Sequence, residues 1–352
     1  MNDDVLITLL GALTGLLSAV VTSFIIPVVQ KRQEKAEQRR SIYERYAQPL
    51  AADAVNLLWR LDEILVRQRG QYLDESAPPT PFNQYKLTST CFRIATLLGW
   101  IRAIKLEQSH LLYGEDASLD NLRAAVVAFE SALADGPHVE VHILEGLAAL
   151  WEVTLPPDRS LREKLAAQVV AELQHGLLVY GLTRYQELPN LAHARQIEVA
   201  RRVAGSMSAM LGLPPVPEPV LGRSCGEAMG IAAVKQAWLY RDWQQAIGDV
   251  MIREIDGASR RYDVIGYGAF EALFAEAGNP WIERLRSVVV GVDPANPLPG
   301  DFRLAQLRNV ARAVARVVCA IENLDVGRKI LDPQACELGR SLAELPATGA
   351  SR

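Results

Sequence analysis

An uncharged run of 25 residues, Val5–Val29, constrains the folds open to this chain more than any other feature. A helix of about 20 apolar residues is long enough to cross the hydrocarbon core of a bilayer. A secretory signal peptide has a basic start and a shorter apolar stretch, whereas this run follows Asp3 and Asp4. The sequence therefore predicts an uncleaved N-terminal transmembrane helix within residues 1–30.

The segment after the run predicts an orientation. Gln30–Arg40 holds five basic and two acidic residues. Basic residues beside a span favour the cytoplasmic side of the membrane. We therefore expect a short N-terminus outside the cell and residues 31–352 in the cytoplasm.

One face of the predicted span consists of small residues spaced four apart. These residues are Gly11, Gly15, Ala19 and Ser23. Such spacing lets two helices approach closely in lipid, so this face is a candidate for self-association into a homo-oligomer. The alternative is that it reflects only the general abundance of small residues in membrane helices.

Composition excludes some classes of function. Apolar residues make up 49% of the chain and charged residues 22%, which is typical of a folded globular protein. The net charge of −4 carries no polyanion-binding signature, so nucleic acid is not an expected partner. The four cysteines form no CxxC pair and give no indication of zinc or redox chemistry. No cofactor is predicted.

Apolar residues recur at helical spacing through most of the remaining chain, so the sequence predicts an all-α fold in which a helical bundle follows the span. Pro49 suits the first turn of a helix, and Asn279 before Pro280 predicts an N-cap followed by proline. Prolines from Pro214 to Pro219 predict a break. The predicted segments are a transmembrane anchor (1–30), a basic juxtamembrane stalk (31–48), a helical domain (49–213), a proline-rich linker (214–224), a second helical subdomain (225–344) and a loose tail (345–352).

The most regular helical pattern lies in residues 301–324. Its apolar positions alternate spacings of three and four, at Leu304, Leu307, Ala311, Val314, Val318 and Ile321. Such a seam either docks onto the chain's own bundle or forms a coiled coil with another chain. Docking onto the chain's own bundle is the more common arrangement, and we expect it here.

Two histidines and a glutamate form the candidate metal site. His138 and His142 are four residues apart and Glu145 follows three residues later, so a helix places all three on one face. Histidine and carboxylate side chains are typical zinc ligands. The order is not the HExxH order of metalloproteases, and the alternative is a pair of surface histidines at a helix start.

Arginines form a ridge on the last long helix. Arg308, Arg312 and Arg316 are spaced four apart, with Arg303 nearby. Like charges at this spacing repel each other, and an anionic partner would relieve the repulsion. The alternative is a solvated face with acidic neighbours from another helix.

Three short segments carry a family resemblance: Tyr46–Leu50, Thr88–Cys91 running into Gly99–Arg102, and Gln244–Gly248. With the N-terminal run, they resemble a group of uncharacterised bacterial proteins that have one N-terminal span and a helical cytoplasmic region. The resemblance implies bacterial origin and anchoring in the inner membrane. It implies no activity.

The sequence contains no phosphate-binding loop, dinucleotide fingerprint or nucleophile elbow. We therefore expect a membrane-tethered cytoplasmic interaction protein, a sensor, scaffold or effector that contacts a protein partner. Two alternatives stay open. One is a membrane-anchored metal-dependent hydrolase that uses the His138 site, and the other is a membrane-disrupting defence effector.

Overall fold

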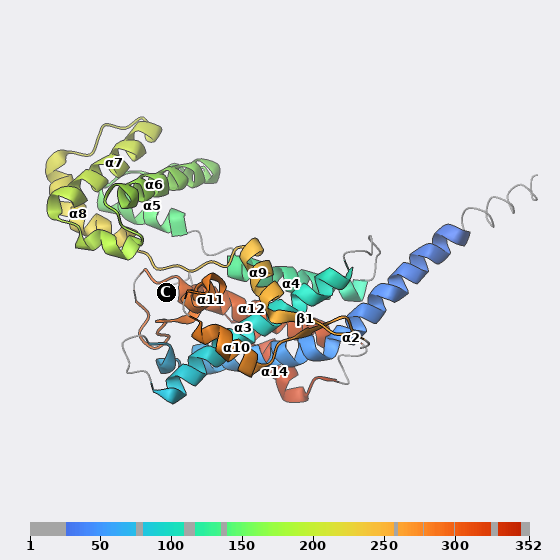
Figure 1. Cartoon of the computed structure of the whole chain (residues 1–352). Coiled ribbons are helices and arrows are strands. Elements are labelled where there is room, and N and C mark those ends of the chain that lie inside the picture. The colour runs from blue at the N-terminus through green and yellow to red at the C-terminus, as the bar shows by residue number, and fades with distance from the viewer. Residues whose placement is uncertain are drawn as a thin grey trace, which may run out of the picture.

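The computed structural model describes residues 26–74, 80–108, 117–134, 139–256, 260–276, 278–298, 300–324 and 330–345. These residues are mostly helical, which confirms the predicted helical bundle. The helices form two parts, each around its own hydrophobic core (Figure 1). We call them the core bundle and the helical lobe. The lobe lies at one end of the core bundle, and the start of α2 projects at the other end.

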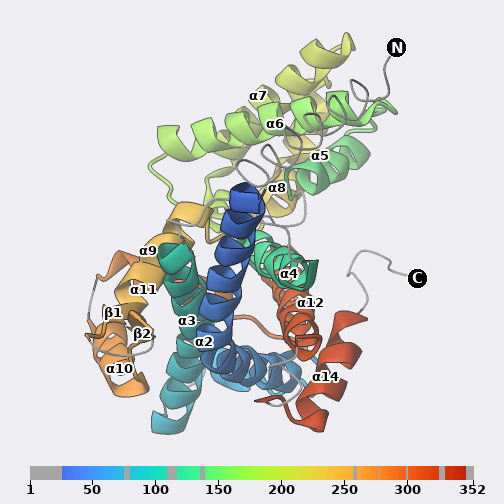
Figure 2. The ribbon, with the colours of Figure 1, turned by 90° about the vertical axis from the view of Figure 1, so that its right-hand side faces the viewer.

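The core bundle contains eight of the described helices and one 3-10 helix. Their bounds are α2 (Ile26–Leu65), η2 (Gln71–Leu73), α3 (Pro81–Gln108), α4 (Ala117–Ala134), α9 (Arg241–Met251), α10 (Tyr267–Ala275), α11 (Pro280–Val289), α12 (Arg303–Glu322) and α14 (Pro333–Ala343). Helix α12 packs against α4, α14 and α2, and α3 lies along α2 (Figure 2). All six apolar positions of the α12 seam are buried in this core, which confirms that the seam docks onto its own bundle.

The helical lobe consists of α5 (Val139–Leu150), α6 (Arg159–Val179), η3 (Tyr185–Asn190), α7 (His193–Leu211) and α8 (Glu218–Ala232). These elements pack on one another around residues such as Leu144, Leu173 and Met207, which are fully buried. Residues 214–224, the predicted linker, include the start of α8. The chain turns between α7 and α8 at Gly212, whose φ of 64° is a left-handed value that glycine adopts without strain.

A short antiparallel hairpin adds the only regular strands in the described part of the chain. Strand β1 (Ile252–Glu254) pairs with β2 (Tyr262–Val264), with Arg253 opposite Asp263. The hairpin contacts α3, and the backbone N–H of Tyr262 donates to the hydroxyl of Tyr46 at 3.2 Å. The fold is therefore a helical bundle with one small hairpin.

The predicted transmembrane helix requires a correction. Among the helices that the structure describes, none combines the length and the apolar character needed to cross a bilayer. The described part of α2 begins at Ile26 and soon enters the charged segment from Lys31 to Arg40, which explains its polarity. Residues 1–25, which carry most of the predicted span, lie outside the described residues. A fold with a transmembrane helix is therefore not supported.

Candidate functional site

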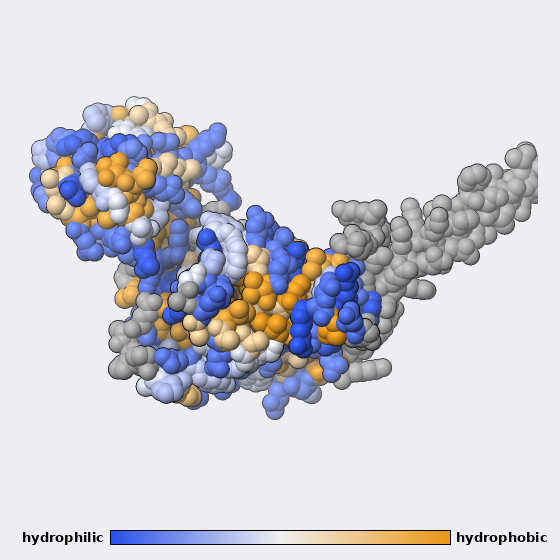
Figure 3. Space-filling view, viewed as in Figure 1, coloured by the Kyte–Doolittle hydropathy of each residue, from blue (hydrophilic) through white to orange (hydrophobic). Residues whose placement is uncertain are grey.

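A cationic cleft lies where the helical lobe meets the core bundle. Its volume is about 600 Å³, within the range of small-molecule sites. The space-filling view shows the lobe standing out from the bundle (Figure 3). Five basic residues and one acidic residue line the cleft, namely Arg184, Lys235, Arg284, Arg286, Arg303 and Glu283.

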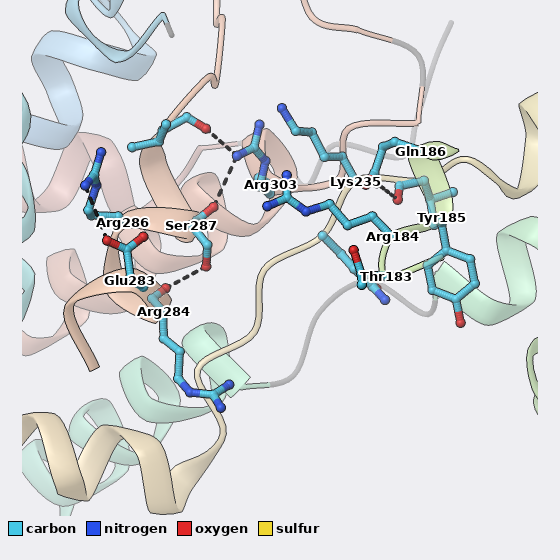
Figure 4. A pocket seen from close by; sticks show the side chains of 13 residues that line it. Thr183, Arg184, Tyr185, Gln186, Lys235, Glu283, Arg284, Arg286, Ser287 and Arg303 are labelled. Atoms are coloured by element: carbon cyan, nitrogen blue, oxygen red, sulfur yellow. Dashed lines mark hydrogen bonds and ion pairs between the residues drawn. The ribbon is translucent and has the colours of Figure 1, made fainter. Parts of the chain in front are cut away.

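The lobe places Arg184 at the cleft through a short capped turn. The backbone N–H groups of Thr183 and Arg184 donate to the Glu187 carboxylate at 2.9 and 3.2 Å. This carboxylate lies in the first turn of η3 and fixes the loop that precedes it. The Arg184 side chain is exposed and points across the cleft toward Arg303 (Figure 4).

Lys235 lies on the segment that connects the lobe to the core bundle. Its backbone N–H donates to the carbonyl of Gly300 at 2.7 Å, and its carbonyl accepts from Phe302 at 2.9 Å. Gly300 has a φ of 78°, a left-handed value that glycine adopts without strain. The Lys235 backbone is thus fixed while its half-buried side chain stays beside the cleft.

Arg303 forms the wall of the cleft on the core-bundle side. Its guanidinium donates to Asp301 at 2.9 and 2.7 Å, to the carbonyls of Ser287 and Gly291 at 3.1 Å each, and to the carbonyl of Val290. All five N–H groups of the guanidinium are therefore used within the protein. Its side chain is only 4% exposed, so Arg303 ties the end of α11 to the start of α12 and is not free to bind a ligand.

The two arginines of α11 are also engaged. Arg286 forms an ion pair with Glu283 at 3.4 Å, and Arg284 stacks on the ring of Trp243 at 3.5 Å from its centre. Both side chains point away from Arg184 (Figure 4). The charge of Arg284 adds to the positive potential of the cleft, whereas the charge of Arg286 is balanced by Glu283.

Arg184 and Lys235 differ from Arg286 and Arg303, which are paired with carboxylates, and from Arg284, which has no ion pair among the described residues but stacks on Trp243. In the part of the chain that the structure describes, no ion pair or side-chain hydrogen bond joins either side chain to another group. Two charges of the same sign thus border one cavity, and the described residues supply neither with a counter-ion. An anion with several oxygen acceptors would satisfy both of them.

The candidate metal residues are only partly within the described chain. His138 lies outside it. The ring of His142 packs edge-on against Phe302 at 5.0 Å, and Glu145 approaches Arg162 at 3.7 Å. No group of three or more His, Cys, Asp or Glu suited to a metal occurs among the described residues. The three-residue site stays a prediction.

The arginine ridge does not form one common surface. Arg303 is buried as described above. Arg312 donates to the carbonyl of Leu345 at 3.5 Å and also contacts Asn309. Arg308 is partly buried and Arg316 is exposed. The small-residue face of Gly11, Gly15, Ala19 and Ser23 lies outside the described residues.

Comparisons with protein-family models, curated proteins and solved structures find no match for this chain. Sequence reasoning identified Arg303 but missed Arg184 and Lys235. These two residues are 51 positions apart and fit no motif, so only the tertiary fold brings them together.

Proposed function

We propose that this chain is a ligand-responsive interaction protein whose cleft between lobe and core bundle binds an anion. This proposal keeps the sensor role expected from the sequence. The observation that carries it is the pair of uncompensated cations, Arg184 and Lys235, at a cavity large enough for a small organic molecule.

The proposal has a simple electrostatic basis. Two charges of one sign that border the same cavity repel each other, and an anion between them is attracted to both. Arginine presents a planar fork of donors to phosphate or carboxylate oxygens, and lysine adds a compact charge. Glu283, the only acidic lining residue among those that the structure describes, is already paired with Arg286 and so opposes an anion weakly.

Binding in the cleft links the two parts of the protein. Arg184 belongs to the lobe, whereas Ser287 belongs to α11 of the core bundle. A ligand that contacts both stabilises one arrangement of the lobe relative to the bundle. A change in that arrangement is a suitable signal for a protein partner.

Calorimetric titration with inorganic phosphate and pyrophosphate tests the proposal. We expect pyrophosphate to bind at 0.15 M salt, and Arg184→Ala and Lys235→Ala each to weaken its binding by at least tenfold. Arg316→Ala is the matched control, because it removes the same charge from an exposed position outside the cleft. Absence of binding, or an equal loss in the Arg316→Ala variant, would overturn the proposal.

A further inference from the structure

We propose that the ligand of the cleft is a phosphate monoester of a sugar or a similar polyol. This inference rests on the anion-binding function proposed above and adds the class of ligand. It depends on the uncharged residues that line the cleft, most of which carry hydroxyl or amide groups. Four of them are used in the argument, namely Thr183, Gln186, Gln236 and Ser287.

The hydrogen bonds already made by these side chains determine what they can still offer. The amide nitrogen of Gln186 donates to the carbonyl of Val234, which leaves its oxygen as an acceptor. The oxygen of Gln236 accepts from the Trp238 indole at 2.9 Å, which leaves its NH₂ group as a donor.

The hydroxyl groups of the cleft add further capacity on both of its sides. Ser287 donates its hydroxyl to the carbonyl of Arg284 at 2.6 Å and keeps its acceptor lone pairs. Thr183 contributes an exposed hydroxyl from the lobe. The cavity is thus lined by both donors and acceptors, and a ligand hydroxyl, which both donates and accepts, matches such a lining.

The charges favour a phosphate over a single carboxylate. The side chains of Arg184 and Lys235 together need more negative charge than one carboxylate supplies. A phosphate monoester carries close to two negative charges at neutral pH and has three terminal oxygens. The cavity of about 600 Å³ is much larger than a phosphate group, so it has room for an organic part.

The aromatic content of the lining disfavours a nucleobase. Tyr185 is the one aromatic side chain among the described residues that line the cleft. Its ring packs against the hydrophobic core of the lobe and points away from Arg303 (Figure 4). Burial raises the pKa of its hydroxyl, which is hydrogen-bonded to Gln174. The described part of the lining therefore presents no aromatic face for base stacking, which usually contributes strongly to nucleotide binding.

A series of compounds that share a phosphate monoester group and differ in their organic part tests this inference on the whole chain. The probes are methyl phosphate, ribose 5-phosphate, glucose 6-phosphate and AMP, titrated by calorimetry. We expect at least one sugar phosphate to bind ten or more times tighter than methyl phosphate. We also expect AMP to bind no tighter than ribose 5-phosphate, from which it differs by its adenine base.

Two variants distinguish contacts to the phosphate group from contacts to the polyol. Arg184→Ala should weaken all four probes. Thr183→Val removes one hydroxyl at nearly constant volume, so it should weaken the sugar phosphates by threefold or more and leave methyl phosphate unchanged. Arg316→Ala should change none of the affinities.

The outcomes distinguish the two proposals. If AMP binds tighter than ribose 5-phosphate, or if neither sugar phosphate exceeds methyl phosphate tenfold, the ligand class is overturned and the anion site stands. If Thr183→Val weakens methyl phosphate as much as the sugar phosphates, the polyol contact is overturned. If none of the four probes binds although pyrophosphate does, the ligand class is overturned and the anion site stands. If pyrophosphate does not bind either, the anion-binding function itself fails.

Discussion

At the scale of single residues, Arg303 shows how a charge can be structural although it lines a cleft. Its five N–H groups donate hydrogen bonds to Asp301 and to three carbonyls near the end of α11. A cation at the C-terminal end of a helix also interacts favourably with the helix dipole. Arg303 therefore holds α11 and α12 in the positions that form one wall of the cleft.

Arg303→Met should destabilise the protein by about 3–5 kcal/mol, because it leaves Asp301 and several carbonyls without their partner. Urea denaturation measures this change. The control is Arg316→Met on the same helix, which is exposed and should stay within about 0.5 kcal/mol of the parent. A loss below about 1 kcal/mol for Arg303→Met would contradict the structural role.

Cys91 provides a pH-dependent prediction. Burial raises the pKa of its thiol from the ordinary 9.0 to about 12. Because the folded pKa exceeds the unfolded pKa, the stability from the neutral thiol is complete below pH 9 and is lost as the pH rises toward 12. Between pH 8 and 10.5 the parent should lose about 2 kcal/mol more stability than Cys91→Ala. Urea denaturation at the two pH values measures these losses. If the parent and Cys91→Ala lose the same stability between pH 8 and 10.5, the thiol does not titrate in this way.

At the scale of secondary-structure elements, the contact of α3 with α9 depends on a close approach. A Cβ at Gly248 would lie 2.7 Å from the Cβ of Arg102 and 3.2 Å from the carbonyl oxygen of Leu98. The first contact cannot be relieved by moving the end of a side chain. Helix α9 must shift if any side chain is added at this position.

Gly248→Ala should therefore destabilise the protein by about 1–3 kcal/mol, measured by urea denaturation. The matched control is Gly222→Ala in α8, where no atom lies within 4 Å of the added methyl group. Alanine favours helix over glycine by about 1 kcal/mol, so the control should be neutral or stabilising. Destabilisation of the same size in both variants would exclude the packing explanation.

Helix α2 shows that a local sequence pattern can mispredict where a helix begins. Pro49 was expected near a helix start, yet it lies inside the continuous helix Ile26–Leu65. Proline inside a helix removes one backbone hydrogen bond and crowds the carbonyl four residues earlier, and tertiary packing can offset that cost. From Tyr46 onward α2 is held by its buried stripe, which includes Leu50, Leu57 and Leu61. At Asn279 the local signal was sufficient, since its side chain accepts from Trp281 and Ile282 as an N-cap.

At the scale of the whole molecule, the lobe and the core bundle have separate hydrophobic cores. The lobe runs from Val139 to Val234, between two stretches of the core bundle. Separate cores commonly open as separate units, and hydrogen exchange detects such units. The protein should therefore behave as two coupled units, with the cleft between them.

Leu173→Ala should cost about 2–5 kcal/mol and raise amide exchange in α5–α8 while leaving the core bundle unchanged. Leu57→Ala is the matched variant in α2. It should raise amide exchange in the core bundle and leave α5–α8 unchanged. Both leucines are fully buried, so the comparison is between sites of equal burial. Hydrogen-exchange mass spectrometry measures both patterns. Increased exchange throughout the chain in both variants would show a single cooperative unit.

The sequence by itself determined the helical class and the buried face of α12, because apolar spacing and helix capping are local properties. The sequence also predicted a transmembrane helix, which the described helices do not support. Only the tertiary structure decided that Arg303 is saturated, and that Arg184 and Lys235 border one cavity. The reason is physical: whether a charge is paired depends on backbone and side-chain groups brought near by folding, and spacing along the chain does not contain that information.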